Sequence, residues 1–184
     1  MKKTRHEKEK KPSSPYRWAF TAFLMAVGLS AVLTLLSESM LAGAGLLLAL
    51  LILLLFICLG ILFDIIGTAV ISADQKPFHS MASHKEKGAK QALMLLRNAD
   101  RVSSVCNDVV GDICGIVSGA TSAVIVTQLQ KGLNLQSVLI SVGVTALVSG
   151  MTIGGKALGK PFAMKRSTRV VYLAGRFLYL FRRR

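Results

Sequence analysis

The stretch LLLALLILLLFICLGILF, residues 46–63, decides the fold of this chain. It contains no charged residue, and apolar side chains would cover every face of a helix formed by it. A soluble helix keeps a polar side, whereas lipid accepts a helix that is apolar all round. The stretch therefore predicts a helix that crosses a membrane.

Three further stretches of the chain lack charge: residues 18–37, 113–130 and 132–155. Each is close to the roughly 20 residues that a helix needs to cross the bilayer core. We therefore predict an all-α, polytopic membrane protein with four transmembrane helices.

The net charge of +14 is distributed in a pattern that indicates topology. Of the 23 Lys and Arg residues, only Lys131 lies outside residues 1–17, 76–101 and 156–184. With four crossings these three zones lie on one side, and the positive-inside rule makes that side cytoplasmic. We expect a multi-pass protein of the cell membrane with both termini in the cytoplasm. This topology explains the basic charge, so no nucleic acid is expected as a partner.

The chain divides into three predicted parts. Residues 1–15 are charged and rich in Ser and Pro, as is typical of a disordered tail. Residues 16–160 form the four-helix membrane domain, in which the cytoplasmic loop 72–101 contains a helical pair. Residues 161–184 alternate arginines with apolar side chains, which predicts an amphipathic helix on the bilayer surface. The Gly-rich segment 154–160 favours irregular backbone at the end of helix four.

Polar residues at the cytoplasmic ends of the uncharged stretches, still within the predicted helices, are the candidates for function. The segment SSVCNDVVGDICG, residues 103–115, contributes Asn107, Asp108 and Asp112, helix two contributes Asp64, and helix four contributes Lys156. At ~1.5 Å per residue, Asp64, Asp108 and Lys156 lie roughly 10 Å from the cytoplasmic boundary, and Asp112 lies about one turn deeper. Charges there are costly and need partners. Either they line a cation cavity with freed backbone carbonyls, or Lys156 pairs with an acid to hold the bundle together.

Helices three and four also carry small and polar residues at three- and four-residue spacing. Gly111, Gly115 and Gly119 form a small-xxx-small pattern that lets another helix approach closely. On helix four the hydroxyl residues Ser141, Thr145, Ser149 and Thr152 recur on one face and lead to Lys156.

An enzyme is not expected. His6, His79 and His84 all lie outside the predicted spans, and no catalytic triad, metal-binding helix motif or phosphate loop is present. The three cysteines show no paired zinc spacing, so we interpret them as small apolar core residues.

Three segments carry a resemblance to a known family. They are KGAKQALMLLRNADR (residues 87–101), IGTAVISADQ (residues 66–75) and GKALGKPFAMKRSTRVVYLAGRFLYLF (residues 155–181). The chain resembles the membrane domain of the cyclin M/CorC magnesium transporters, with helix one as an extra crossing. The resemblance implies a dimer with an acidic, inward-opening cation site fed by broken helices. We expect a stand-alone membrane domain without the CBS domains of full-length members.

The chain departs from the family motifs at several positions. Ile66 and Gly67 replace a serine and a glutamate, Lys156 replaces a glutamate, and Gly159 replaces a proline. The asparagine of the family's Gly-Asn-Asn motif corresponds either to Asn107 or to Asp112.

Two functions follow from the resemblance and the residues. The first is transport or binding of a divalent cation, Mg²⁺ above all, because Mg²⁺ prefers oxygen ligands. The expected ligands of this cation are Asn107, Asp108, Asp112, Asp64 and Gly155. The alternative is a non-transporting membrane subunit in which Lys156 fills the former cation site. The expected partners are the lipid bilayer and either a second copy of this chain or a full-length family member.

Overall fold

The computed structural model describes residues 15–133 and 138–182. Over these residues the chain is helical and contains no strand, as predicted. The predicted disordered tail, apart from its last residue, lies outside the described residues.

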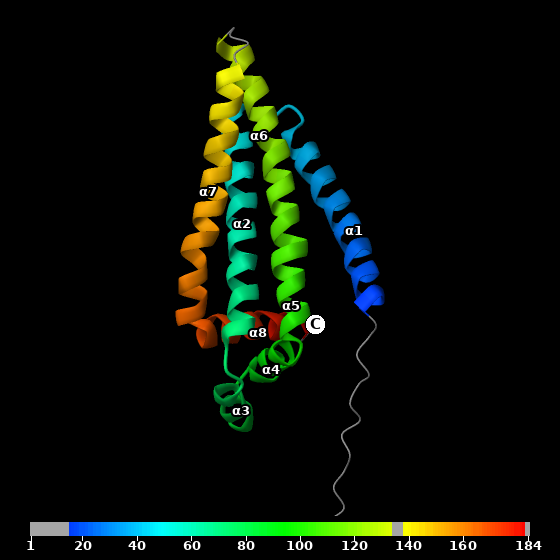
Figure 1. The fold of residues 1–184 in the computed structure, drawn as a ribbon, viewed down its shortest axis with the longest axis vertical. Helices are drawn as coiled ribbons and strands as arrows, with labels where there is room; N and C mark the ends of the chain where they lie inside the picture. The colour runs from blue at the N-terminus through cyan, green and yellow to red at the C-terminus, as the bar shows by residue number, and fades with distance from the viewer. Residues whose placement is uncertain (1–14, 134–137, 183–184) are drawn as a thin grey trace, which may run out of the picture.

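The four predicted membrane crossings are confirmed as long apolar helices within the described residues. They are α1 (Pro15–Leu41), α2 (Leu46–Ser72), a third span that joins α5 (Ala99–Ser104), the π-helix η1 (Val105–Gly111) and α6 (Asp112–Leu133), and α7 (Val138–Lys165). Figure 1 shows α2 between α6 and α7, with α1 at the side of the group.

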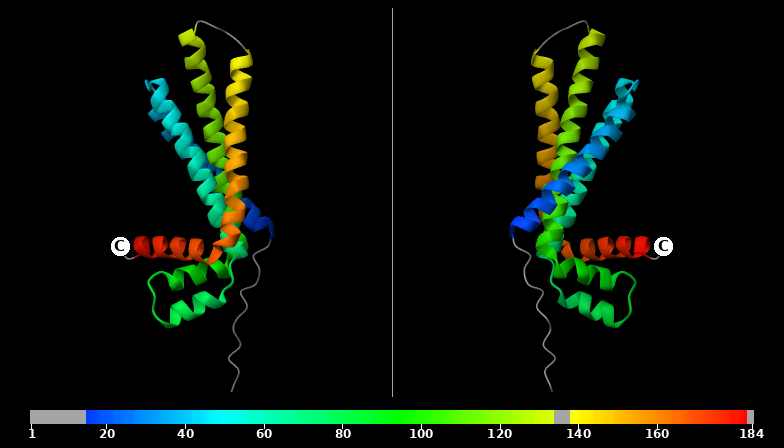
Figure 2. Two further views of the ribbon diagram at one scale, coloured as in Figure 1. Left: turned by 90° about the vertical axis from the view of Figure 1, so that its left-hand side faces the viewer. Right: turned by 90° about the vertical axis from the view of Figure 1, so that its right-hand side faces the viewer.

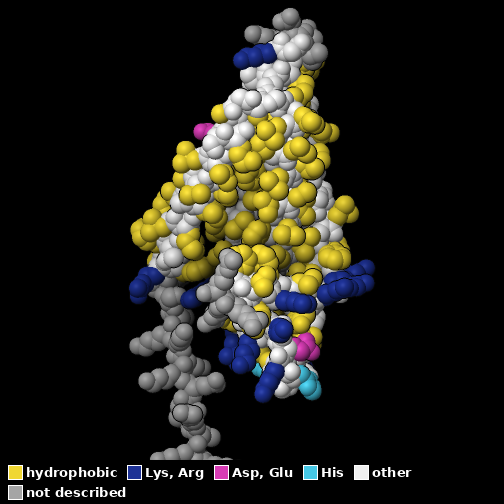
Figure 3. Space-filling view, turned by 180° about the vertical axis from the view of Figure 1, so that it is seen from behind, with side chains coloured by type: hydrophobic (Ala, Val, Ile, Leu, Met, Phe, Trp, Pro, Cys, Tyr) yellow, Lys and Arg dark blue, Asp and Glu magenta, His cyan; other side chains and the backbone are white. Residues whose placement is uncertain are grey.

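Three shorter helices lie together at one end of the spans. The predicted helical pair is α3 (Lys76–Ser83) and α4 (Ala89–Arg97), and the predicted C-terminal amphipathic helix is α8 (Ser167–Arg182). Figure 2 shows α8 running across the end of the bundle, with α4 and then α3 on its far side. The described start of α1 lies at this same end (Figure 1). Basic side chains gather here, while the surface of the spans is hydrophobic (Figure 3).

α2 is the central helix of the bundle, and its most extensive contacts are with α6 and α7. One side of α2, including Ile52, Phe56 and Ile57, is buried against residues of α6 such as Ile113 and Val117. A second apolar cluster, centred on Phe78, joins α2 to the three helices at the end of the bundle. The protein therefore has one core between the spans and another beneath them.

α1 packs on the bundle through apolar side chains such as Leu33, and polar contacts add to this packing. Ser37 and Thr121 of α6 share a hydrogen bond of 3.4 Å, and both side chains are buried. Near the other end of α1, the guanidinium of Arg101 lies 5.2 Å from the ring centroid of Trp18. A guanidinium over an indole face is a favourable cation–π contact.

The predicted irregular backbone at residues 154–160 is wrong, because α7 is helical throughout this segment. The glycines here serve packing instead. A Cβ on Gly155 would overlap the Ile61 side chain of α2, and one on Gly159 would lie 2.8 Å from Ile65 Cγ1. α7 also continues through Pro161 to Lys165, and α8 begins at Ser167.

α4 and α8 cross at glycines, with almost no space between their backbones. A Cβ on Gly175 of α8 would lie 2.7 Å from the backbone nitrogen of Ala92 and 2.8 Å from the carbonyl oxygen of Gly88. Gly88 has a φ of +93°, which a residue with a side chain rarely adopts. The two glycines therefore determine how closely α8 packs on α4.

We predict that Gly175→Ala destabilises the protein by about 1–3 kcal/mol, because a methyl group at this crossing forces the two backbones apart. Gly28→Ala in α1 is the matched control, since nothing lies within 4 Å of its Cβ position. Thermal unfolding of the purified full chain in detergent measures both variants. Equal melting temperatures for the two would contradict the close crossing.

Candidate functional site

The backbone of the third span changes to a π-helix where its polar residues lie. η1 covers Val105–Gly111, with the sequence VCNDVVG, between α5 and α6. π-Helical turns are rare, carry i→i+5 hydrogen bonds and often occur at functional sites. Sequence reasoning missed this turn, since residue propensities carry no specific signal for it.

Asn107 of the π-helix packs directly on the backbone of α2. Its amide group occupies the space that a Cβ on Gly67 would need. The amide Nδ2 donates a hydrogen bond of 3.2 Å to Ser103 Oγ. Asn107 Oδ1 is buried and has no hydrogen-bond partner among residues 15–133 and 138–182. The nitrogen of this amide is thus held by Ser103, while its oxygen packs against the α2 backbone at Gly67.

Asp64 lies on the same face of α2 as Gly67, three residues earlier along the helix. Its side chain is only 6% exposed, and no group in the described part of the chain forms a hydrogen bond with its buried Oδ2. Gly60 lies one turn before Asp64 on this face and contacts the start of α6. A Cβ on Gly60 would lie 3.2 Å from Cys114 Cβ. Gly60 and Gly67 of α2 therefore both contact the third span, and Asp64 lies between them on the same face of α2. Asp64 and Asn107 each bring a buried, unpartnered oxygen to this junction.

Lys156 of α7 reaches the end of the π-helix. Its Nζ lies 3.6 Å from the position that a Cβ on Gly111 would take. The side chain is half-buried, so the ammonium lies inside the bundle and not at its surface. Because Asp64 Oδ2 has no hydrogen-bond partner in the described part of the chain, Lys156 does not donate to it.

Asp108 and Asp112 lie apart from this junction, and both side chains are exposed. The polar face predicted for helix three is wide, and the other helices cover only one edge of it. Gly111, Ser118 and Ser122 are buried on that edge, whereas Asp108 and Gly119 are exposed on the other. The structure thus brings Asp64 and Asn107 together and points Asp108 and Asp112 outwards.

Gly155, the remaining predicted ligand, faces Ile61 inside a regular part of α7. A carbonyl in an uninterrupted helix already accepts a hydrogen bond from the residue four positions later. Proline has no backbone N–H, so Pro161 instead deprives the carbonyl of Ala157 of its helical donor. The freed carbonyl oxygen of α7 therefore belongs to Ala157. Over residues 15–133 and 138–182, no three His, Cys, Asp or Glu side chains come together as a metal cluster.

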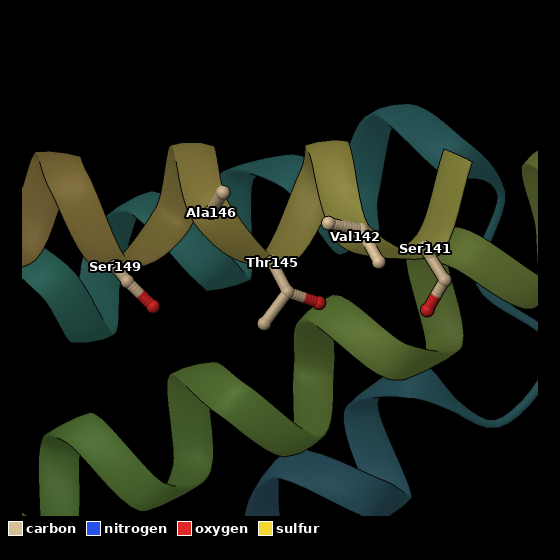
Figure 4. A pocket seen from close by; sticks show the side chains of 5 residues that line it. All are labelled: Ser141, Val142, Thr145, Ala146 and Ser149. Carbon is tan, nitrogen blue, oxygen red and sulfur yellow. The ribbon is translucent and has the colours of Figure 1, made fainter. Parts of the chain in front are cut away.

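A shallow pocket lies along α7, nearer the opposite end of the spans. It has a volume of about 390 Å³ and is lined by Ser141, Val142, Thr145, Ala146 and Ser149. Figure 4 shows the hydroxyl groups of Ser141, Thr145 and Ser149 on the side of α7 that faces α6. This row of hydroxyl groups continues the line of Lys156 along α7.

The family model for the cyclin M transmembrane N-terminal domain matches residues 50–183, most of the 184-residue chain. The chain belongs to this family. No curated protein and no solved structure matches the chain. The match begins inside α2 and runs through α8, so it includes the Asp64–Asn107 junction, while α1 precedes it. The chain is thus a membrane protein of a family associated with divalent cation transport.

We predict that Gly67→Ala displaces Asn107 from α2 and costs about 1–3 kcal/mol of stability, because the new methyl group overlaps the amide. Gly154→Ala is the matched control in this cyclin M domain, since its Cβ position is open. Thermal unfolding measures the loss. A Gly67→Ala protein as stable as Gly154→Ala would show that the amide does not rest on Gly67.

Proposed function

We propose that this cyclin M family protein carries a divalent cation across the membrane, with Mg²⁺ as the cargo. The observation that supports this is the pair of buried, unpartnered oxygens, Asp64 Oδ2 and Asn107 Oδ1, on facing helices. A buried polar atom without a partner costs about 1–3 kcal/mol, and more when it is charged. A cation bound between the two oxygens would offset this cost.

The chemistry of these groups suits Mg²⁺. Carboxylate and amide oxygens are hard ligands, and Mg²⁺ is commonly held by one or two carboxylates while it keeps several of its waters. Asp64 supplies one carboxylate, Asn107 one amide oxygen, and the nearby Ser103 hydroxyl a further polar contact. A site with few protein ligands also permits release, which transport requires.

The exposed acids Asp108 and Asp112 have a separate role in this proposal. A charged side chain facing lipid within a span costs at least ~2.5 kcal/mol near the centre, so such residues face water or protein. We propose that the two acids line the entrance from the cytoplasmic side, where negative charge raises the local cation concentration. Both acids lie toward the basic end of the molecule. By the positive-inside rule, we propose that this end, with both termini, lies on the cytoplasmic side of the cell membrane.

A second copy of the chain is the partner that we propose. α6 exposes the small residues Gly119, Ala120 and Ala123 on one face, and nothing lies within 4 Å of the Cβ positions of Gly115 and Gly119. Small-residue faces of transmembrane helices allow close packing with another helix. A full-length family member could dock on the same face.

Flux through vesicles containing the purified full chain tests the transport proposal. We predict Mg²⁺ flux in the parent that falls at least tenfold in Asp64→Asn, because the variant loses the ligand's charge. In a metal chelator the same variant should melt at a higher temperature than the parent, since the unpaired buried charge is gone. Glu38→Gln is the matched control, because Glu38 is an exposed acid near the C-terminal end of α1. A parent without flux above empty vesicles would contradict transport.

The second candidate function, a non-transporting membrane subunit, is favoured by the position of Lys156. An ammonium close to a carboxylate takes the part that a bound cation would have. Here the lysine ammonium extends into the bundle at Gly111, beside the junction that holds Asp64.

Reversing the charge of Lys156 distinguishes the two functions. For a non-transporting subunit we predict no flux in the parent and a gain of Mg²⁺ flux in Lys156→Glu. Lys160→Glu is the matched control, one turn further along α7 at an exposed position. The contrary result is flux in the parent protein that Lys156→Glu leaves unchanged or increases only slightly. That result would contradict a site blocked by Lys156.

A further inference from the structure

α8 leaves a stripe of large apolar side chains uncovered. Leu173 is 55% exposed, Phe177 62%, Leu180 69% and Phe181 68%. At 100° per residue these four side chains lie within one sector of the helix. The rings of Phe177 and Phe181 also contact each other, with centroids 4.9 Å apart. An apolar stripe of this kind on a short helix needs a covering surface.

The opposite side of α8 packs against the protein at Val171 and Gly175. Val171 is 0% exposed and belongs to the apolar cluster with Ala92 of α4, and Gly175 meets the α4 backbone. α4 lies on the side of α8 that points away from the spans (Figure 2). The uncovered stripe is on the other side of α8, so it faces the layer that the transmembrane helices occupy. α8 also extends sideways from the bundle at this level, beyond the cover of the other helices (Figure 2).

Arginines border the apolar stripe along one edge. Arg169 and Arg176 are both exposed, and they are two turns apart on the same edge of the helix. No Asp or Glu occurs anywhere from residue 156 to the end of the given sequence. This surface therefore carries positive charge with no acidic side chain of its own segment to balance it.

We propose that α8 is an interfacial helix that binds anionic phospholipid headgroups. Leu173, Phe177, Leu180 and Phe181 enter the acyl-chain boundary, and Arg169 and Arg176 contact the headgroup phosphates of the same leaflet. Helices with an apolar face and arginines at its border bind the membrane interface in this way, and the arginines favour anionic lipid. The position of α8 at the end of the spans places its stripe at the depth of this boundary. The inference stands on α8 alone and does not depend on cation transport.

The first experiment measures which lipids the full chain retains. The parent is purified from bilayers of phosphatidylcholine with one-quarter phosphatidylglycerol, and the two retained lipids are quantified by mass spectrometry. We expect phosphatidylglycerol to be enriched in the parent and the enrichment to fall in Arg169→Gln/Arg176→Gln. Each arginine near an anionic surface contributes about fivefold, so the loss should reach roughly 25-fold.

The control removes the same number of charges from the cytoplasmic loop. Lys87 and Lys90 are exposed on the α3–α4 side, away from the stripe, so Lys87→Gln/Lys90→Gln should keep the enrichment. An equal loss in both double variants would mean that only net charge matters and would overturn the proposal. Unchanged retention in the arginine variant would also overturn it, and would favour an acidic protein segment as the occupant of this surface.

The second experiment reports the depth of the stripe directly. Trp18, the single tryptophan, is replaced by Phe, and a new tryptophan is introduced by Phe177→Trp. In vesicles of the same composition, lipids brominated near the start of the acyl chains should quench its fluorescence strongly. His79→Trp, at an exposed position of α3, should be quenched little. Equal, weak quenching at both positions would show that the stripe is not inserted and would overturn the proposal.

Discussion

The close approach of the π-helix to α2 is the constraint on which the rest of the structure depends. Gly60 and Gly67 have no side chains, so the facing segment of the third span packs against the α2 backbone at both positions. Asp64 lies on the same face between the two contacts and is buried as a result. A larger residue at position 67 would separate the helices, and the carboxylate of Asp64 would then meet solvent or lipid.

The burial of Asp64 and Asn107 has an energetic consequence. A low-dielectric interior makes an unpartnered polar atom expensive and makes its interaction with a cation strong. The protein therefore retains an interior that is less stable than an apolar one would be. The proposed cation site would offset this cost, and its residues lie on packed helices. In the proposed function, the ammonium of Lys156 beside Gly111 would weaken the binding of a further cation.

The sequence predicted the elements of this fold better than their details. Uncharged stretches identified the four spans, because the bilayer sets a minimum helix length. The apolar positions Ala89, Ala92 and Leu96 predicted α4, and each is buried in the structure. The Gly-rich segment of α7 was assigned irregular backbone because glycine weakens isolated helices. Packing against Ile61 and Ile65 of α2 instead keeps this segment helical.

The candidate site was predicted in part. Reasoning from the sequence selected Asp64 and Asn107 as candidate oxygen ligands, and in the structure both lie where α2 meets the π-helix. It grouped Asp108 and Asp112 with them, whereas both acids face outwards. Helical periodicity alone could not separate these residues, since it does not say which edge of a face the neighbouring helices cover. The π-helix adds a change of register that no periodic pattern of an α-helix contains.

By itself, the sequence determined that this protein is helical, spans a membrane four times and carries its basic residues at one end. These properties follow from hydrophobic length and charge, which are local and additive along the chain. Only the tertiary structure decided which polar atoms are buried without partners, where the π-turn lies and which face of α8 stays uncovered. Each of these depends on contacts between helices distant in the sequence, such as Gly67 with Asn107 and Gly88 with Gly175.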